Sequence, residues 1–480
     1  MKKKASVILL SLLICNFFVV NSMAHIVGPE IVEPTASGWE FKEDNPDVSN
    51  SRVNDLERAS KPPDPMGKGV FFCGKKVYKN GTSFGWFGAI GLNGTFLFER
   101  EISTPYFKNA TSCQYNSTSV IYVAGYGPQG CSIYKVNYSG DIYWNMSFGE
   151  AGDVLHQIAI IKIDGLPVST SNGISAVGVK ADGKRGFYYN INELNQSVNF
   201  NHSVGVDSSN EWDQVLAVAT DPYLPNIVYL GGRKATSSSR PEKYDGFLIQ
   251  FNIVNKSLEW ERDLSTGSDT AIQAIQVEPI YGGVVSVGYM GDDALVYPLT
   301  FYNDEIWKLY EKPYFLWGGL SKDEATDVII LGESTFMIYI TGTTGSYGWN
   351  KDCFVVKMNL YQEIQWEKLY GAMGVDLSAT LTGEPAMSVF IGGCTDNKYI
   401  IVQNPAGNIN IFAKFFGSDF NALLFVLITS SGAITIIIMA YLIVRRRKRG
   451  EEISTWVEDQ KKQAVEKDQE KQAADEGKDA

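Results

Sequence analysis

A pattern that recurs roughly every 50–57 residues most constrains what this chain can fold into. Each copy has an apolar run that ends in glycine, a second apolar run that often follows an aspartate, and a third run that often contains tryptophan. The clearest copy comprises Ile227–Leu230, Gly246–Phe251 and Ser257–Glu261. Short apolar runs bounded by Gly, Asp and Asn are typical of β-strands. The marker glycines of the copies are Gly74, Gly125, Gly178, Gly231, Gly288, Gly342 and Gly392.

A fourth apolar run comes before the marker glycine. Where this run is clearest it begins at an aspartate, namely Asp153, Asp213, Asp269, Asp323 and Asp376. Four strands in each of about seven copies predict an all-β fold, a seven-bladed β-propeller over residues 50–416. A single four-stranded sheet cannot cover both of its apolar faces, whereas packing each blade against two neighbours does so.

One known repeat family is similar to this pattern. The similarity is clearest in Met337–Gly342 (MIYITG), Asp352–Asn359 (DCFVVKMN) and Glu363–Glu367 (EIQWE). Together with the aspartate-led strand before them, these strands resemble the SBBP repeat of bacterial and archaeal surface proteins. The resemblance implies a seven-bladed propeller in an extracellular setting, and it implies neither a substrate nor a catalytic residue. The copies around Gly74 and Gly178 depart most from it, because they lack the aspartate before the third strand and the tryptophan in the last.

Residues 1–24 have the organisation of a secretory signal peptide. The basic residues Lys2–Lys4 precede an apolar stretch, and Ser22–Ala24 is a small-x-small cleavage site. A membrane anchor that stays attached is the alternative, although the apolar stretch is short for a span. The N-terminus therefore predicts export of the chain.

Residues 421–444 form an apolar run long enough to span a bilayer. The basic cluster Arg445–Arg449 follows at once, and such a cluster faces the cytoplasm. With the signal peptide, this predicts a type I single-pass protein of the plasma membrane whose N-terminus is outside. Residues 25–49 are predicted to be a linker or a strap, and residues 445–480 a charged cytoplasmic tail, disordered or helical.

Asn-x-Ser/Thr sequons are dense in the exported part and predict N-glycosylation. They are Asn80, Asn93, Asn109, Asn116, Asn137, Asn145, Asn195, Asn201 and Asn255. None lies between Ser257 and the predicted span, so the first four blades are expected to carry glycans and the last three to be bare. Two explanations stay open: composition alone produces this distribution, or the bare side faces a partner or the membrane.

The cysteines that remain after signal cleavage are odd in number. They are Cys73, Cys113, Cys131, Cys353 and Cys394. In an oxidising compartment at least one is then unpaired or bonded to another chain, which fits a disulfide-linked or non-covalent oligomer. Candidate pairs are Cys113 with Cys131 and Cys353 with Cys394, although spacing does not determine connectivity.

The net charge of the chain is −12. Lys2–Lys4 leave with the signal peptide, and the tail carries as many acids as bases, so the mature exported part has a charge of about −15. An acidic exterior argues against nucleic acid as a partner and suits a basic partner or cation-rich surroundings.

Two sets of recurring side chains allow both a functional and a structural interpretation. The aspartates that begin the inner strands form either a cation-binding ring at one mouth of the propeller or a set of turn caps. The tryptophans either stack on a sugar or cofactor or pack between blades; they are Trp144, Trp260, Trp307 and Trp366. Equivalent positions in each repeat favour the structural interpretation in both cases.

Little in the chain predicts a reaction. His25, the mature N-terminus, would need a nearby imidazole to chelate copper, and only His156 and His202 remain. No catalytic triad, nucleophile elbow or quinone-docking motif is present, so the sequence predicts no catalytic residue, no metal and no cofactor.

The sequence thus predicts a surface glycoprotein whose propeller recognises an extracellular protein or glycan without catalysis. Two alternatives remain. A carbohydrate-active enzyme predicts a close carboxylate pair in which one pKa is raised, and a structural coat protein predicts ordered lateral assembly.

Overall fold

The computed structural model describes most of the region that the repeat pattern covers. The described residues are 30–32, 40–42, 44–58, 69–91, 95–116, 120–161, 173–204, 213–235, 243–264, 267–278, 283–299, 314–331, 337–347, 351–359, 362–370, 376–384, 388–395 and 398–405. The chain divides into the units Met1–Asn408 and Ile409–Ala480, and every described residue belongs to the first. The predicted signal peptide, span and tail lie outside these ranges, within which no helix has the length and apolarity to cross a membrane.

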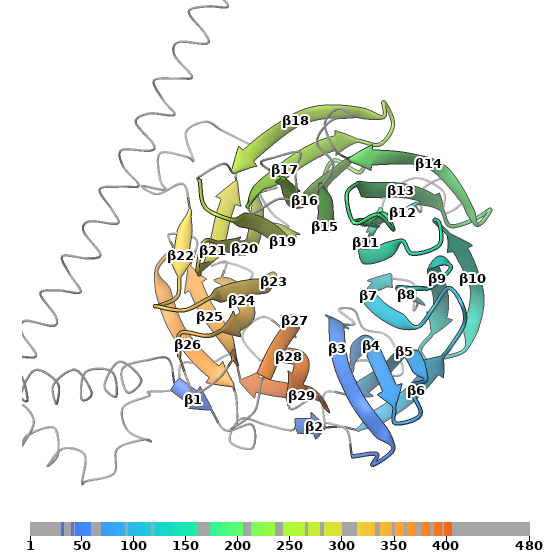
Figure 1. Ribbon diagram of the computed structural model, residues 1–480, viewed down its shortest axis with the longest axis horizontal. Coiled ribbons are helices and arrows are strands. Elements are labelled where there is room, and N and C mark those ends of the chain that lie inside the picture. The colour runs from blue at the N-terminus through green and yellow to red at the C-terminus, as the bar shows by residue number, and fades with distance from the viewer. Residues whose placement is uncertain are drawn as a thin grey trace, which may run out of the picture. The chain divides into compact units, whose positions relative to one another are not determined.

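Six blades, numbered here in chain order, are each built from four consecutive antiparallel strands around a common axis (Figure 1). Their strands are β3 (Val48–Arg58), β4 (Gly69–Tyr78), β5 (Ser83–Gly91), β6 (Phe96–Ile102), β7 (Asn109–Asn116), β8 (Val120–Gly127), β9 (Gly130–Asn137), β10 (Ile142–Phe148), β11 (Val154–Ile161), β12 (Gly173–Val179), β13 (Gly186–Asn192), β14 (Ser197–Val204), β15 (Gln214–Thr220), β16 (Ile227–Ala235), β17 (Tyr244–Asn252), β18 (Ser257–Leu264), β19 (Thr270–Val277), β20 (Val284–Met290), β21 (Asp293–Leu299), β22 (Phe315–Trp317), β23 (Asp323–Leu331), β24 (Met337–Thr344), β25 (Asp352–Asn359) and β26 (Ile364–Tyr370). The first strand of each blade lies nearest the axis and the fourth lies at the rim (Figure 1). The predicted all-β propeller with four-stranded blades is confirmed.

A further sheet closes the ring and is composite. It contains β27 (Asp376–Glu384), β28 (Ser388–Thr395) and β29 (Lys398–Pro405), and its rim strand is the N-terminal β2 (Glu40–Lys42), antiparallel to β29. A second N-terminal strand, β1 (Glu30–Val32), adds in parallel to β26 of blade 6. The expectation of seven equivalent blades therefore needs correction: six are continuous four-strand units, and the closing sheet joins the two ends of the repeat region. Residues 25–49, expected to be a linker or strap, contain both added strands.

Every innermost strand carries a β-bulge, and a marker glycine lies opposite it. On β15, for example, the register shifts between Val215 and Ala217, and Val215 pairs with Gly232 of β16. A Cβ on Gly232 would lie 1.9 Å from the backbone oxygen of Gln214. The same close approach, between 1.9 and 2.1 Å, occurs at Gly74, Gly125, Gly178, Gly288 and Gly342. The bulged inner strand thus leaves no room for a side chain, which explains why glycine marks the repeat.

Two marker glycines were assigned one residue too early from the sequence. The residue opposite the bulge is Gly232 rather than Gly231, and Gly393 rather than Gly392. In both copies two glycines stand side by side, and the repeat spacing alone does not choose between them. The register of the bulge does, because only one of the two faces the shifted carbonyl.

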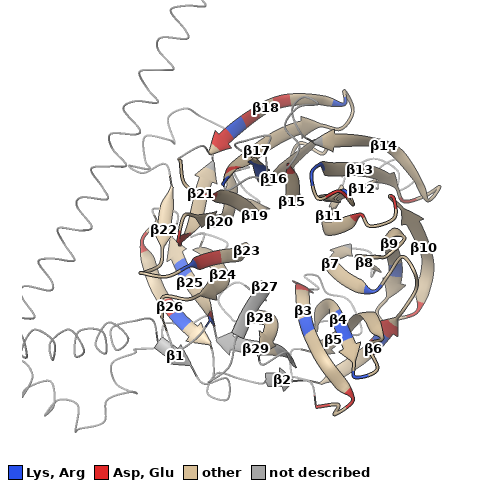
Figure 2. Ribbon diagram, viewed as in Figure 1, with Lys and Arg blue, Asp and Glu red and all other residues tan. Residues whose placement is uncertain are grey.

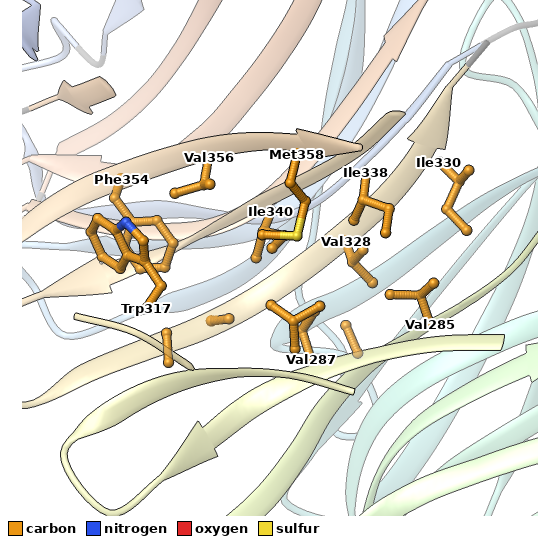
Figure 3. Close-up of a cluster of buried hydrophobic side chains, with 14 of the residues drawn as sticks. Val285, Val287, Trp317, Val328, Ile330, Ile338, Ile340, Phe354, Val356 and Met358 are labelled. Atoms are coloured by element: carbon orange, nitrogen blue, oxygen red, sulfur yellow. The ribbon is translucent and has the colours of Figure 1, made fainter. Parts of the chain in front are cut away.

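The apolar core lies between blades. Between blades 5 and 6, Val287 and Ala274 pack against Val328, Ile340 and the residues around them (Figure 3). The ring of Trp317 on β22 lies 4.2 Å from that of Phe354 on β25. Each sheet is therefore covered on the face that it cannot bury alone, as the propeller prediction requires.

Of the recurring tryptophans, Trp144 and Trp366 pack in the apolar clusters between blades, as predicted, and Trp260 is half-buried. Each lies across its blade from a tyrosine of the second strand; the pairs are Tyr122 with Trp144, Tyr229 with Trp260 and Tyr339 with Trp366, at centroid distances of 6.2, 6.4 and 6.0 Å. Trp366 also packs on Val389 of the closing sheet. Trp307 and the residues around it lie outside the described residues, and the fourth described strand of blade 5 is β22, which contains Trp317.

Candidate functional site

The innermost strands β11, β15, β19 and β23 all begin at one face of the ring, next to the recurring aspartates. We call this the Asp face. Asp153 and Asp323 are fully buried there, and Asp213 is almost so. Asp153 accepts hydrogen bonds from the backbone nitrogens of Glu150 (2.8 Å) and Ala181 (3.1 Å) and from Lys180 Nζ (3.0 Å).

Three of the five recurring aspartates, Asp153, Asp269 and Asp323, therefore fasten loops, whereas the side chain of Asp376 lies outside what the structure describes. Asp269 Oδ1 accepts from the backbone nitrogen of Tyr244 in the neighbouring blade, at 2.9 Å. Asp323 accepts from Gly319 and from both the nitrogen and the hydroxyl of Ser346. No group of three or more metal-ligating side chains was found among the described residues. The contacts favour turn capping over the cation-binding interpretation.

Arg233 on β16 is the most distinctive side chain of the Asp face. It pairs in register with Gln214, which directly follows Asp213 at the start of β15. Its Nε and Nη2 donate to Gln214 Oε1 at 3.0 and 2.9 Å, and its Nη1 donates to the hydroxyl of Tyr289 in blade 5 at 3.0 Å. Its guanidinium carbon lies 4.3 Å from the centre of the Tyr244 ring. Four contacts with neutral groups hold this cation in one orientation.

No ion pair within 4.0 Å joins Arg233 to a carboxylate of the described residues. The adjacent Lys234 differs, because its ammonium group pairs with Glu261 (3.5 Å) and with Asp263. Both acids lie on the rim strand β18, whose mixed charges are visible in Figure 2. Arg233 is thus a partly buried, oriented cation without a directly paired carboxylate among the described residues; the Asp269 carboxylate lies near its partners Tyr244 and Tyr289.

The charge of Arg233 acts on its surroundings. Burial lowers the pKa of the His156 imidazole to about 4, and the positive charge of Arg233 contributes to this shift. Burial raises the pKa of the Tyr289 hydroxyl, which Arg233 opposes. At neutral pH the two groups are therefore uncharged, and they do not balance the guanidinium.

Lys322 brings a second positive charge to the same face. Its Nζ lies 4.7 Å from the centre of the Tyr289 ring and 3.4 Å from Glu324 Oε2. The other oxygen of Glu324 accepts a hydrogen bond from Gln273. Lys322, Tyr289 and Arg233 thus follow one another around the ring, from three neighbouring blades. We refer to Arg233, Gln214, Tyr244, Tyr289 and Lys322 as the Arg233 cluster.

A second polar arrangement links innermost strands near the closing sheet. Thr380 Oγ1 on β27 lies 2.9 Å from Asp327 Oδ2 and 3.2 Å from Asp55 Oδ1. Asp55 Oδ2 accepts from Ser112 Oγ (2.9 Å) and from the backbone nitrogen of Cys113 (2.8 Å) in blade 2. Burial first, and then the charge of Asp327, raise the pKa of Asp55 to about 7. This is a carboxylate pair with one raised pKa, and its oxygens are engaged in contacts between blades.

Asp55 makes the stability of the ring depend on pH. Its pKa in the folded chain, about 7, lies above the reference value of 3.8, so the folded chain binds the extra proton between these values. The associated stabilisation is complete below about pH 4 and is lost as the pH rises through about 7. We expect Asp55→Asn, which keeps a carbonyl acceptor for the Cys113 nitrogen, to remove this loss.

Chemical denaturation of the purified full chain and of Asp55→Asn at about pH 5 and about pH 8 checks this expectation. Between the lower and the higher pH, the variant should gain stability relative to the native chain by at most roughly 3 kcal/mol. A difference between the two proteins that is the same at both pH values would contradict it.

The five cysteines of the described residues are buried thiols in this structure, and no disulfide joins them. The predicted pairs Cys113–Cys131 and Cys353–Cys394 are not joined here. The nearest thiol to Cys113 belongs instead to Cys73 in the adjacent blade, within hydrogen-bond contact, and burial raises the pKa of both. Sequence spacing missed this neighbour because the contact crosses from one blade to the next.

The sequons differ in accessibility. Five have exposed asparagines: Asn80, Asn145, Asn195, Asn201 and Asn255. Asn137 is half-buried, and Asn93 and the side chain of Asn116 lie outside what the structure describes. Asn109 is 4% exposed, and its Oδ1 accepts from Asn54 Nδ2 at 2.9 Å. A glycan on Asn109 cannot be accommodated in this fold.

Asn195 and Asn255 lie in equivalent turns, between the third and fourth strands of blades 3 and 4. Because the strands of a blade alternate in direction, these turns lie at the end of the blade opposite the Asp face. Glycans attached to Asn195 and Asn255 would therefore not cover the Asp face of these blades.

Comparisons with known proteins found only distant structural similarity. No family model matches the chain, and no curated protein matches it significantly, so the SBBP resemblance finds no support there. A crystal structure of Raptor from Chaetomium thermophilum is similar with a TM-score of 0.47 and 9% identity, over 75% of this chain and 30% of that chain. A Dos1 propeller is similar with a TM-score of 0.42 and 10% identity, over 78% of this chain and 96% of that chain. The topology of this chain itself establishes the propeller.

Proposed function

We propose that this chain is a type I single-pass glycoprotein of the plasma membrane whose propeller recognises an extracellular partner without catalysis, through the Asp face. The observation that carries the recognition role is the Arg233 cluster. An arginine held by neutral partners costs desolvation energy and is a prepared binding group. The signal-peptide pattern, the apolar run at 421–444 and the sequon density support the topology.

A carbohydrate-active enzyme is the second candidate, because Asp55 and Asp327 meet at one hydroxyl and the pKa of Asp55 is raised. The hydrogen bonds that Asp55 makes to neighbouring blades argue against this role. One of its oxygens accepts from Ser112 and Cys113, and the other lies against Thr380. A general acid needs a proton that can reach substrate, and these contacts direct the carboxyl group toward the neighbouring blades.

Glycopeptide mapping of the full-length chain expressed in a secretory host tests the topology. We expect glycans on the exposed sequons Asn80, Asn145, Asn195, Asn201 and Asn255. Asn109 should be unmodified, because its buried amide group contacts Asn54. A chain without any glycan would contradict export, and a glycan on Asn109 in the folded chain would contradict this fold.

Binding of the purified full-length chain, clustered on beads in detergent, to intact cells tests the recognition role. We expect saturable binding that the unclustered chain competes away. Turnover of a glycan panel that Asp55→Asn abolishes would favour the enzyme instead. Assembly of the chain into sheets without binding would favour the coat protein, which was the other alternative from the sequence.

A further inference from the structure

We propose that the Arg233 cluster binds a carboxylate group of an acidic peptide segment. This inference rests on the proposed recognition role and names the chemistry of its ligand. It also revises the expectation from net charge alone, which favoured a basic partner for an acidic exterior. On the Asp face, however, the side chain with unused hydrogen-bond donors is a cation, Arg233.

The first argument is the unused donor capacity of Arg233. A guanidinium has five N–H groups. Its Nε, one N–H of Nη2 and one N–H of Nη1 are used by Gln214 and Tyr289. One N–H therefore remains on each terminal nitrogen, without a partner among the described residues. Two N–H groups on adjacent nitrogens match the two oxygens of a carboxylate.

The second argument is electrostatic. The contacts of Arg233 are with an amide, a hydroxyl and an aromatic ring, all uncharged, so its charge is available to an incoming anion. Lys322 lies beside Tyr289 with its side chain 52% exposed, but it already pairs with Glu324 at 3.4 Å, so the charge available to a ligand is that of Arg233. Because Arg233 is only partly accessible to water, an ion pair formed there is stronger than one on the open surface.

The third argument selects a peptide over a sugar acid. Sugar recognition uses open aromatic faces, and the two rings of the cluster are occupied. The guanidinium of Arg233 covers Tyr244 at 4.3 Å, and Tyr289 is 3% exposed beneath the ammonium group of Lys322. What remains accessible is polar and directional, which suits an acidic side chain presented by a peptide.

The test uses the full-length chain in detergent and a fluorescent hexaglutamate peptide, acetylated and amidated at its ends, with hexaglutamine as the uncharged comparison. We expect saturable binding of hexaglutamate alone, weakened about ten- to a hundred-fold by Arg233→Gln. Arg233→Lys keeps the charge but not the paired donors, so its affinity for hexaglutamate should lie between those of the native chain and Arg233→Gln. Each variant is first checked for native-like thermal unfolding.

The matched control is Arg185→Gln, which removes the same charge from a loop between the second and third strands of blade 3. Arg185 is 59% exposed and already pairs with Asp182 at 3.1 Å, so its loss should leave binding unchanged. Equal weakening by the Arg185 and Arg233 variants would reduce the effect to general electrostatics and overturn the proposal. The proposal would also be overturned if Arg233→Lys and Arg233→Gln both bound hexaglutamate with the affinity of the native chain.

Two further outcomes separate this inference from the proposed function. Binding to cells that neither hexaglutamate nor Arg233→Gln affects would overturn the acidic-peptide inference and leave recognition standing. Competition by sialyllactose but not by hexaglutamate would assign the cluster to an acidic glycan instead. If hexaglutamate binds and cells do not, the site is supported and the cell-surface role is contradicted.

Discussion

Gly342→Ala is expected to destabilise the propeller by about 3 kcal/mol or more, the largest effect that we expect from a single methyl group in this chain. The added Cβ would lie 2.0 Å from the backbone oxygen of Glu324 and 2.7 Å from the Phe354 ring. The ring can turn, but the carbonyl belongs to the bulged strand β23 and is fixed by pairing with β24. Relief therefore requires the innermost strand to move.

The control is Gly69→Ala on β4, where the nearest atom to the new Cβ is the Ile90 oxygen at 3.3 Å. Alanine gives the unfolded chain less conformational freedom than glycine does, which favours folding. The free energy of unfolding of this variant should therefore lie within about 1 kcal/mol of that of the native protein. Denaturant unfolding of both purified variants gives the comparison. Equal stability of Gly342→Ala and Gly69→Ala would mean that the bulge does not exclude a side chain.

The glycine positions show both how far the sequence predicts this fold and where it fails. Hydrophobic runs and a regular period locate most strands, because each blade repeats the same burial problem. They do not reveal a one-residue bulge, so Gly231 and Gly392 were taken for the markers instead of Gly232 and Gly393. A bulge adds one residue to the inner strand without changing the hydrophobic pattern of the strand beside it.

Two other failures have different causes. The rim strand β22, which contains Trp317, was not predicted, because it is only three residues long and lies farther along the chain from β21 than the repeat spacing indicates. The closing strand β2 was not predicted, since three residues give no period and its partner β29 lies at the other end of the repeat region. Pairing between distant segments leaves little trace in a single sequence.

The Arg233 cluster was also missed. In other copies the residue after the marker glycine is Lys75, Tyr126, Val179, Tyr289, Thr343 or Cys394, so Arg233 does not stand out by type. What distinguishes it is its partners, which come from β15, β17 and β20. That no described carboxylate pairs with it depends on three-dimensional packing, which the sequence pattern does not reveal. The recurring aspartates, by contrast, were conspicuous in the sequence, and three of them prove to fasten loops.

Asp323→Ala is the second large effect, and it tests that structural role directly. The carboxylate of Asp323 is fully buried. It accepts from the Gly319 nitrogen at 2.9 Å and from the Ser346 nitrogen and hydroxyl at 3.3 and 2.6 Å, and Thr344 also donates to it. Alanine would leave these donors without their acceptor, and each buried donor left unsatisfied costs about 1–3 kcal/mol. We expect a loss of roughly 3 kcal/mol or more.

Asp292→Ala is the matched control, because Asp292 lies in an exposed turn of the Asp face. Its backbone oxygen accepts a hydrogen bond from the Asp323 nitrogen at 2.8 Å, and the substitution keeps this bond. It should change the free energy of unfolding by less than about 0.5 kcal/mol.

Thermal unfolding with and without added Ca²⁺ distinguishes the two interpretations of the recurring aspartates, since a cation that binds only the folded chain raises its melting temperature. We expect no such rise in the native chain. A rise that Asp323→Ala abolishes would restore the cation site, because a turn cap stabilises the loops whether or not a divalent cation is present.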